Sequence, residues 1–154
     1  MPNQTTGPDQ VDVRGPRFTA WVTTAVIVAT LIVSAYSSVA AATVLGLQAV
    51  VFAIGAIGGP CSHPYGRVFA RFVAPRLGSV TQREPAAPLK FAQLVGFVFA
   101  GIGAIGFATG LVAVGLVLTA FALIAAFLNA AFGICLGCQL YPLVARFRNT
   151  PTPA

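Results

Sequence analysis

The sequence predicts an all-α membrane protein, in which four transmembrane helices form two tandem hairpins and a short amphipathic helix lies at the membrane surface. Two observations predict this fold class. Only 8% of the 154 residues are charged and 57% are hydrophobic, whereas soluble domains carry roughly 25% charged residues. In addition, four uncharged apolar runs each approach the roughly 20 residues that a membrane-spanning helix requires.

The first pair of apolar runs covers about residues 18–37 and 39–58. Trp21 and Tyr36 stand near opposite ends of the first run, where aromatic side chains anchor helices at the two membrane interfaces. A cleaved signal peptide is the alternative for this run, but the run is longer than the roughly 7–15 apolar residues of such a peptide. We therefore expect a permanent helix here.

The second pair of apolar runs covers about residues 91–108 and 112–134, with only a short uncharged turn between them. Small residues recur every four positions along both runs, which lets helix backbones approach closely. This pattern favours tight packing within one four-helix bundle, and a homo-oligomer interface is the minor alternative.

The segment between the two pairs, residues 59–90, contains a short amphipathic stretch at about residues 65–74. Its apolar side chains recur with helical spacing at Tyr65, Val68, Phe69, Phe72 and Val73. Arg67 and Arg71 fall on another face, which is typical of a helix lying on a membrane surface. Pro75 is expected to end this helix, and the "REPAAPLK" stretch is expected to be a linker.

The charged residues predict the topology. All of them lie before the first apolar run, between the second and third, or after the fourth. Four spans bring these segments to one side, which the positive-inside rule assigns to the cytoplasm. We expect a single domain over residues 13–148 in the cell (inner) membrane, with cytoplasmic, disordered tails at 1–12 and 149–154. The net charge of +6 suits the lipid bilayer, and no nucleic-acid partner is expected.

An internal repeat relates the two hairpins. "RFTAWV" and "KFAQLV" each begin a hairpin, and "CSHPYGRVFARF" and "CQLYPLVARF" each follow one. Repeats of this kind are often related by an axis along the membrane normal. The alignment pairs Cys61 with Cys138 and predicts that both lie in one cytoplasmic pocket with His63 and Cys135.

Cys135 and Cys138 form a C-x-x-C pair at the end of the last apolar run. Such a pair serves dithiol redox chemistry or half of a metal site, and two small residues that merely close a helix end are the third interpretation. The metal hypothesis adds Cys61 and His63 as ligands for zinc or another thiophilic metal; no other cofactor is expected. Cytosolic thiols are normally reduced, so a permanent structural disulfide is not expected.

Three amides lie inside or near the apolar runs: Gln48, Gln93 and Asn129. We expect them to form hydrogen bonds between helices rather than a transport path, because the runs contain no ionisable pathway residue. Nucleotide-binding glycine loops, Ser/His/Asp sets and paired carboxylates are not found in the sequence. The sequence leaves open whether the protein is an enzyme, and any enzymatic activity would be thiol–disulfide exchange or sulfur transfer.

Four segments of the sequence, in this order, resemble a known family: "VDVRGPRF", "LQAVVFAIGAIGGP", "PLKFAQLVGFVFAG" and "AFLNAAFGICLGCQLYPL". Together they resemble, over about residues 11–148, small actinobacterial integral membrane proteins of unknown function with four helices and an "FGxCLGC" ending. That motif falls on Phe132, Gly133, Cys135, Leu136, Gly137 and Cys138. The family's genes are often found near thioredoxin-like and rhodanese-type proteins, which implies a thiol or sulfur role. The motif does not extend to Cys61.

The leading functional hypothesis is a membrane-anchored dithiol that exchanges electrons or sulfane sulfur with a soluble partner of one of these two kinds. Cys135 and Cys138 would be the attacking and resolving thiols, in either order. The alternatives are a metal-binding or small-solute permeation protein that uses the same cysteines, and a structural membrane subunit without chemistry.

Overall fold

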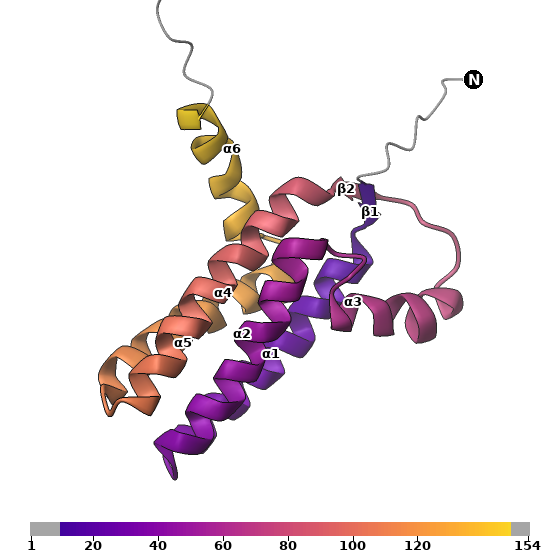
Figure 1. Cartoon of the computed structure of the whole chain (residues 1–154). Coiled ribbons are helices and arrows are strands. Elements are labelled where there is room, and N and C mark those ends of the chain that lie inside the picture. The colour runs from indigo at the N-terminus through magenta and orange to yellow at the C-terminus, as the bar shows by residue number, and fades with distance from the viewer. Residues whose placement is uncertain (1–9, 149–154) are drawn as a thin grey trace, which may run out of the picture.

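The computed structural model describes residues 10–148 (Figure 1). Its helices and strands, in chain order, are β1 (Gln10–Asp12), α1 (Arg14–Ser34), α2 (Ser38–Gly58), α3 (Pro64–Val68), β2 (Arg83–Pro85), α4 (Ala86–Ala108), α5 (Val112–Phe132) and α6 (Leu136–Arg148). Helix α3 continues as a π-helical turn over Phe69–Val73 and a 3₁₀ turn over Ala74–Arg76. Residues 1–9 and 149–154, predicted to belong to the tails, lie outside the described residues.

Helices α1, α2, α4 and α5 are each long and apolar enough to cross a membrane. They run side by side as two hairpins (Figure 1), which confirms the predicted fold class of a multi-pass, all-α membrane protein that contacts the lipid bilayer. Helix α2 packs on α4 and α1 packs on α5, so each hairpin contacts the other through both of its helices.

The helices differ from the predicted bounds mainly at their first turns. Helix α1 begins at Arg14 instead of residue 18, and α4 begins at Ala86 instead of residue 91. The apolar runs mark the part of each helix that fits the hydrocarbon core, whereas Arg14, Arg17 and Lys90 occupy helical turns outside it. Long basic side chains reach the headgroup region from such positions, so the helix continues where the apolar run does not.

Small residues bring the spanning helices close together, as the sequence predicts. The buried core contains Ala41, Leu45, Ala49, Phe52, Ala100 and Phe107. A Cβ atom added to Gly106 of α4 would lie 2.9 Å from the backbone nitrogen of Gly115 of α5, so neither position has room for a side chain. Close backbone approach is the usual basis of helix association in a bilayer.

Strands β1 and β2 form an antiparallel pair in which Val11 lies opposite Glu84. This pairing was not predicted, since residues 10–12 were assigned to a disordered tail and residues 83–85 to a linker. Three-residue strands show too little alternation to be recognised from sequence. The pair joins the start of α1 to the start of α4 at one end of the bundle (Figure 1).

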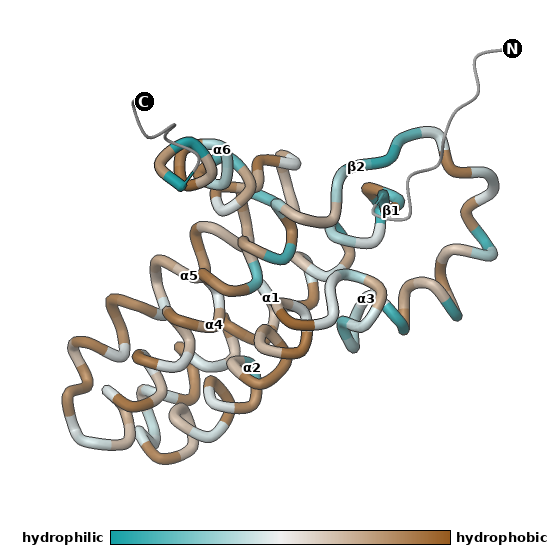
Figure 2. Tube along the Cα trace, turned by 45° about the horizontal axis from the view of Figure 1, so that its top comes forward, coloured by the Kyte–Doolittle hydropathy of each residue, from teal (hydrophilic) through white to brown (hydrophobic). Residues whose placement is uncertain are grey.

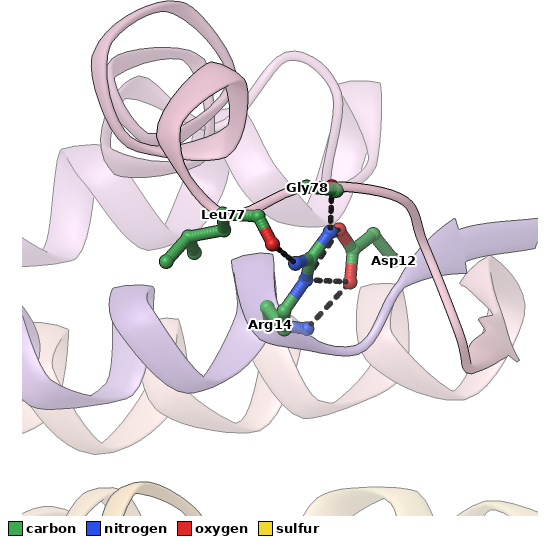
Figure 3. Close-up of polar contacts among 4 residues, drawn as sticks. All are labelled: Asp12, Arg14, Leu77 and Gly78. Atoms are coloured by element: carbon green, nitrogen blue, oxygen red, sulfur yellow. Dashed lines mark hydrogen bonds and ion pairs between the residues drawn. The ribbon is translucent and has the colours of Figure 1, made fainter.

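Arg14 fixes the loop that follows the short helix. Its guanidinium donates hydrogen bonds to the Asp12 carboxylate at 2.8–3.0 Å and to the carbonyl oxygens of Leu77 at 3.1 Å and Gly78 at 3.4 Å (Figure 3). The hydrogen bond from Arg14 holds the pKa of the Asp12 carboxyl below its ordinary value. The loop at residues 77–78 is therefore tied to the start of α1.

The predicted surface helix at about residues 65–74 is observed as the helical segment 64–76, which projects sideways from the bundle (Figure 1). Phe69 is buried against Phe18 of α1, with ring centroids 5.6 Å apart, while Val68 and Phe72 are exposed. The segment passes Pro75 by one residue as a 3₁₀ turn. Its unburied apolar side chains suit contact with lipid.

Polarity is concentrated at one end of the molecule. Figure 2 shows hydrophilic residues around β1, β2, α3 and α6, and hydrophobic residues along the rest of the bundle. Among residues 10–148, every Asp, Glu, Lys and Arg lies within the segments 12–17, 67–90 and 146–148. The C-x-x-C pair also lies at this end, between α5 and α6.

Candidate functional site: the cysteine pair at a helix junction

The C-x-x-C pair lies where α5 ends and α6 begins. Gly133 terminates α5 in the left-handed conformation, with φ of 70°, and its backbone N–H donates to the carbonyl of Asn129. The last spanning helix therefore ends at Phe132 rather than at residue 134. Cys135 directly precedes α6, and Cys138 belongs to its first turn.

Helix α6 itself was not predicted, although the sequence contains a signal for it. Apolar side chains recur with helical spacing at Leu136, Leu140, Leu143, Val144 and Phe147. Pro142 lies inside the helix, where proline is normally unfavourable because it has no backbone N–H to donate. The proline weakens this signal.

The Cys135 side chain caps α6. Its Sγ atom accepts a hydrogen bond from the backbone N–H of Cys138 at 3.2 Å, and its carbonyl oxygen accepts one from Gln139 at 3.0 Å. The first amides of a helix and the positive end of its dipole favour negative charge. This environment would favour a thiolate at Cys135 only once its bond to Cys138 is reduced.

Cys135 and Cys138 are joined by a disulfide, with Cα atoms 5.1 Å apart, and both are half-buried. Cys61 is a free, exposed thiol. Sequence analysis expected reduced thiols, whereas the structure contains the oxidised pair. The two sulfur atoms can therefore bond to each other without any rearrangement of the junction.

Gly137, between the two cysteines, fixes α6 against α4. A Cβ atom at this position would lie 2.6 Å from both the Cα and the Cβ of Ala92. The rings of Phe91 and Tyr141 extend the same contact, with centroids 6.0 Å apart. The glycine therefore allows close packing within a regular helix.

Arg17 places a positive charge beside the junction. Its guanidinium donates hydrogen bonds to the carbonyl oxygens of Ala130 and Ala131, both at 3.5 Å, at the end of α5. Its guanidinium carbon is 4.0 Å from the position that a Cβ would take on Gly133. Arg17 therefore ties the start of α1 to the last carbonyl groups of α5.

Two cavities flank the first turns of α4. The histidine cavity, of about 710 Å³, includes Cys61 and His63, and the cysteine cavity, of about 300 Å³, includes Cys135 and Asn129. Four residues line both cavities and therefore lie between them: Pro16, Thr19, Leu89 and Gln93. Cys61 and His63 thus line one cavity, and Cys135 lines the other.

A family model described as "Domain of unknown function (DUF4395)" matches residues 11–146. The chain belongs to this family. The match covers the four spanning helices and most of α6, and it confirms the resemblance to a family of unknown function. No curated protein and no solved structure matches the chain.

In this DUF4395 member, His63 is the most deeply placed group of the histidine cavity. It is 1% exposed, its Nδ1 accepts the backbone N–H of Tyr65 at 3.3 Å, and its Nε2 has no hydrogen-bond partner among residues 10–148. Burial lowers the pKa of His63 to about 4. The imidazole is therefore neutral at pH 7, with its proton on Nε2.

The four cysteine and histidine side chains of the metal hypothesis are not brought together. Cys61 and His63 line one cavity and Cys135 lines the other, and Leu89 and Gln93 of α4 lie between them. The described part of the chain contains no group of three or more His, Cys, Asp or Glu side chains placed to hold a metal ion. Helix α4 begins at Ala86, earlier than predicted, and Leu89 of its first turn lines both cavities.

The three amides have different surroundings. Gln48 is buried and its Oε1 accepts a hydrogen bond from the Tyr65 hydroxyl at 2.8 Å, so it links α2 to α3 as a bond between helices. Gln93 and Asn129 both line the cysteine cavity. The Oε1 atom of Gln93 is buried and has no hydrogen-bond partner among the described residues.

Proposed function

We propose that this membrane protein is a dithiol–disulfide exchange protein that acts on a soluble partner at the membrane surface. The single observation that carries the proposal is the position of Cys135, whose sulfur caps α6 and accepts the Cys138 N–H. A helix terminus is a place where a thiol becomes a good nucleophile and a good leaving group.

This position supports one order of the two thiols, which the sequence leaves open. The proposed attacking thiol is Cys135, because its sulfur receives the amide hydrogen bond at the start of α6. Cys138 is the resolving thiol, one helical turn away.

The reaction balances within the two proteins. The Cys135 thiolate attacks one sulfur of a partner disulfide, which forms a mixed disulfide and releases the partner's other sulfur as a thiolate. The Cys138 thiolate then attacks the Cys135 sulfur, forms the internal disulfide and releases the second partner thiol. Two electrons and two protons move from the dithiol to the partner, and the reverse reaction uses the same atoms.

The proposed partner is a thioredoxin-like protein or a rhodanese-type sulfurtransferase, as the resemblance implies. With a rhodanese persulfide, the Cys135 thiolate would attack the outer sulfur and release the partner thiolate. Cys138 would then release hydrosulfide from Cys135 as the internal disulfide forms. Both reactions require the same attacking thiol, but they leave different products on a protein without Cys138. The disulfide partner would stay attached as a mixed disulfide, whereas the persulfide partner would leave a Cys135 persulfide.

We further propose that the cysteine junction faces the cytoplasm and that the membrane is the cell (inner) membrane. Residues 10 and 148 lie at the same end of the bundle as the basic segments, which the positive-inside rule assigns to the cytoplasm (Figure 2). A membrane-impermeant maleimide should label Cys61 from the cytoplasmic side and a Tyr36→Cys variant from the opposite side. Labelling of both from one side would contradict this orientation.

The exchange proposal is tested by trapping. A Cys138→Ser variant keeps the attacking thiol but loses the resolving one, so it should accumulate a mixed disulfide with its partner that disappears on reduction. A Cys135→Ser variant should trap nothing. Cys61→Ser combined with Cys138→Ser is the matched control and should trap as well as Cys138→Ser alone.

Equal behaviour of the two single variants would contradict the assigned order. If Cys138→Ser neither captures a thioredoxin-like partner nor accumulates a Cys135 persulfide with a sulfurtransferase in cells, the exchange function is wrong, and the pair then serves only to close the junction between α5 and α6.

A further inference from the structure

The cysteine cavity joins the dithiol to the interior of the membrane domain. Its walls come from α1, α2, α4, α5 and α6, and the rings of Phe52, Phe99 and Phe121 contribute to them. Cys135 lies on this wall beside Leu136. The cavity therefore connects a redox-active sulfur with an aromatic, apolar space between spanning helices.

The lining excludes a charged occupant. None of the residues around this cavity is Asp, Glu, Lys, Arg or His. An anion or a peptide with charged ends would lose its hydration there without a compensating charge. The histidine cavity differs, because Arg67, Arg71 and Arg83 line it. A neutral and mostly apolar molecule is the class that fits the cysteine cavity.

An unpaired polar atom on the wall indicates what else the occupant carries. Thr23 is 3% exposed, and its Oγ1 accepts no hydrogen bond and donates none among residues 10–148. Gln93 and Asn129 contribute amides to the same wall, although the Gln93 side chain also faces His63. Buried polar groups are normally hydrogen-bonded, so the Thr23 hydroxyl calls for a complementary group in the cavity. A hydroxyl can donate to a carbonyl or accept from a hydroxyl.

We propose that the cysteine cavity binds the ring of a lipid-soluble quinone, which exchanges two electrons with Cys135 and Cys138. The inference rests on the proposed exchange function and adds a second redox partner to it. A quinone is neutral and apolar, and its two carbonyls become hydroxyls on reduction, so the Thr23 hydroxyl can donate to the quinone or accept from the quinol. The cavity of about 300 Å³ is at the lower end of small-molecule sites, which is adequate for a ring whose tail extends into lipid.

The proposed step is balanced. The two thiols lose two protons and two electrons and form one S–S bond, while the two carbonyl oxygens of the quinone gain two protons and two electrons and become hydroxyls. Exchange with the soluble partner then reduces the disulfide again. The protein would pass electrons between a soluble thiol protein and the quinone pool of its membrane.

The test uses the full chain in detergent micelles, reduced and freed of reductant, with decylubiquinone as the probe. The ring of this quinone is fully substituted, so it forms no stable thiol adduct. Loss of its ultraviolet absorbance measures quinol formation, and oxidised glutathione serves as the soluble disulfide in a parallel reaction. The parent protein should reduce about one quinone per dithiol.

Two variants locate the reaction in the cavity. Ala126→Leu fills the cavity and should slow quinone reduction about tenfold, while Ala120→Leu, on an exposed position of the same helix, should change it less than about twofold. Thr23→Val keeps the side-chain shape but loses the hydroxyl and should weaken quinone binding about fivefold. All three should react with oxidised glutathione at the parent rate.

Equal quinone reduction by Ala126→Leu and the parent would overturn the inference, because the quinone would then react at the surface. Reaction with oxidised glutathione but not with quinone would also overturn it and leave the exchange function standing; an acyl chain of a lipid would then be the occupant. Failure of both reactions would instead overturn the proposed function.

Discussion

Helices α3 and α6 hold equivalent places in the two halves of the molecule, yet their first residues differ in chemistry. Each helix follows the second spanning helix of a hairpin, and each is capped by the side chain of the residue before it. The His63 imidazole caps α3 by accepting the Tyr65 N–H, and the Cys135 sulfur caps α6 by accepting the Cys138 N–H. The position before each of these helices thus carries a neutral imidazole in the first half and a cysteine sulfur in the second.

The two helices are also fixed in similar ways. A Cβ on Gly66 of α3 would lie 2.6 Å from the carbonyl oxygen of Pro60, and one on Gly137 of α6 would lie 2.6 Å from Ala92. This comparison changes the alignment of the repeat, which paired Cys61 with Cys138. The capping residues His63 and Cys135 are structural counterparts, and this register places Gly66 opposite Cys138.

The largest effect is expected from removing the tight contact of α6. Gly137→Ala forces the helix away from Ala92 and should lower the free energy of unfolding in detergent by about 3 kcal/mol, the upper end of overpacking costs. Gly101→Ala is the matched control on α4, because nothing lies within 4 Å of the added methyl group. Thermal unfolding followed by circular dichroism measures both, and equal melting temperatures for the two variants would show that the α6 contact is not tight.

The next effect concerns the histidine side of the comparison. Because burial lowers the pKa of His63 from 6.5 to about 4, the unfolded chain binds a proton first as the pH falls. Above about pH 6.5 the neutral imidazole makes its full contribution to the free energy of unfolding. This contribution falls between pH 6.5 and 4, and about 2 kcal/mol of it is lost by pH 5. The sequence contains one histidine, so a His63→Gln variant should lose most of this slope. Parallel pH profiles for the parent and the variant would contradict the burial of a neutral imidazole.

The smallest effect is expected at the hydrogen bond between α2 and α3. Tyr65→Phe removes the hydroxyl that donates to Gln48 Oε1 at 2.8 Å. This substitution should lower the free energy of unfolding by about 1 kcal/mol. Tyr141→Phe, on α6, is a matched control, since the ring contact with Phe91 does not need the hydroxyl. If both variants unfold at the parent temperature, the α3 side is held by packing alone.

The spanning helices could be predicted from sequence because a bilayer imposes both their length and their composition. The C-x-x-C pair and the buried Gln48 were also recognisable as unusual residues in apolar surroundings. The site geometry was not, because the start of α6 depends on Gly133 adopting a left-handed conformation and on Gly137 contacting Ala92. Likewise, the separation of Cys61 from Cys135 depends on the first turns of α4, which contain no signal that distinguishes them from a linker.

The central claim is that the start of α6 activates the Cys135 thiol. The most direct measurement is the pH dependence of its alkylation by iodoacetamide in a Cys138→Ser variant, followed by mass spectrometry, with N-acetylcysteine as the reference. The backbone N–H at residue 138 remains in this variant, so the cap is preserved. The account predicts half-maximal reactivity within the range of roughly 3.5–7.5 seen for activated thiols. A midpoint at about 8.5, that of an ordinary cysteine, would contradict it.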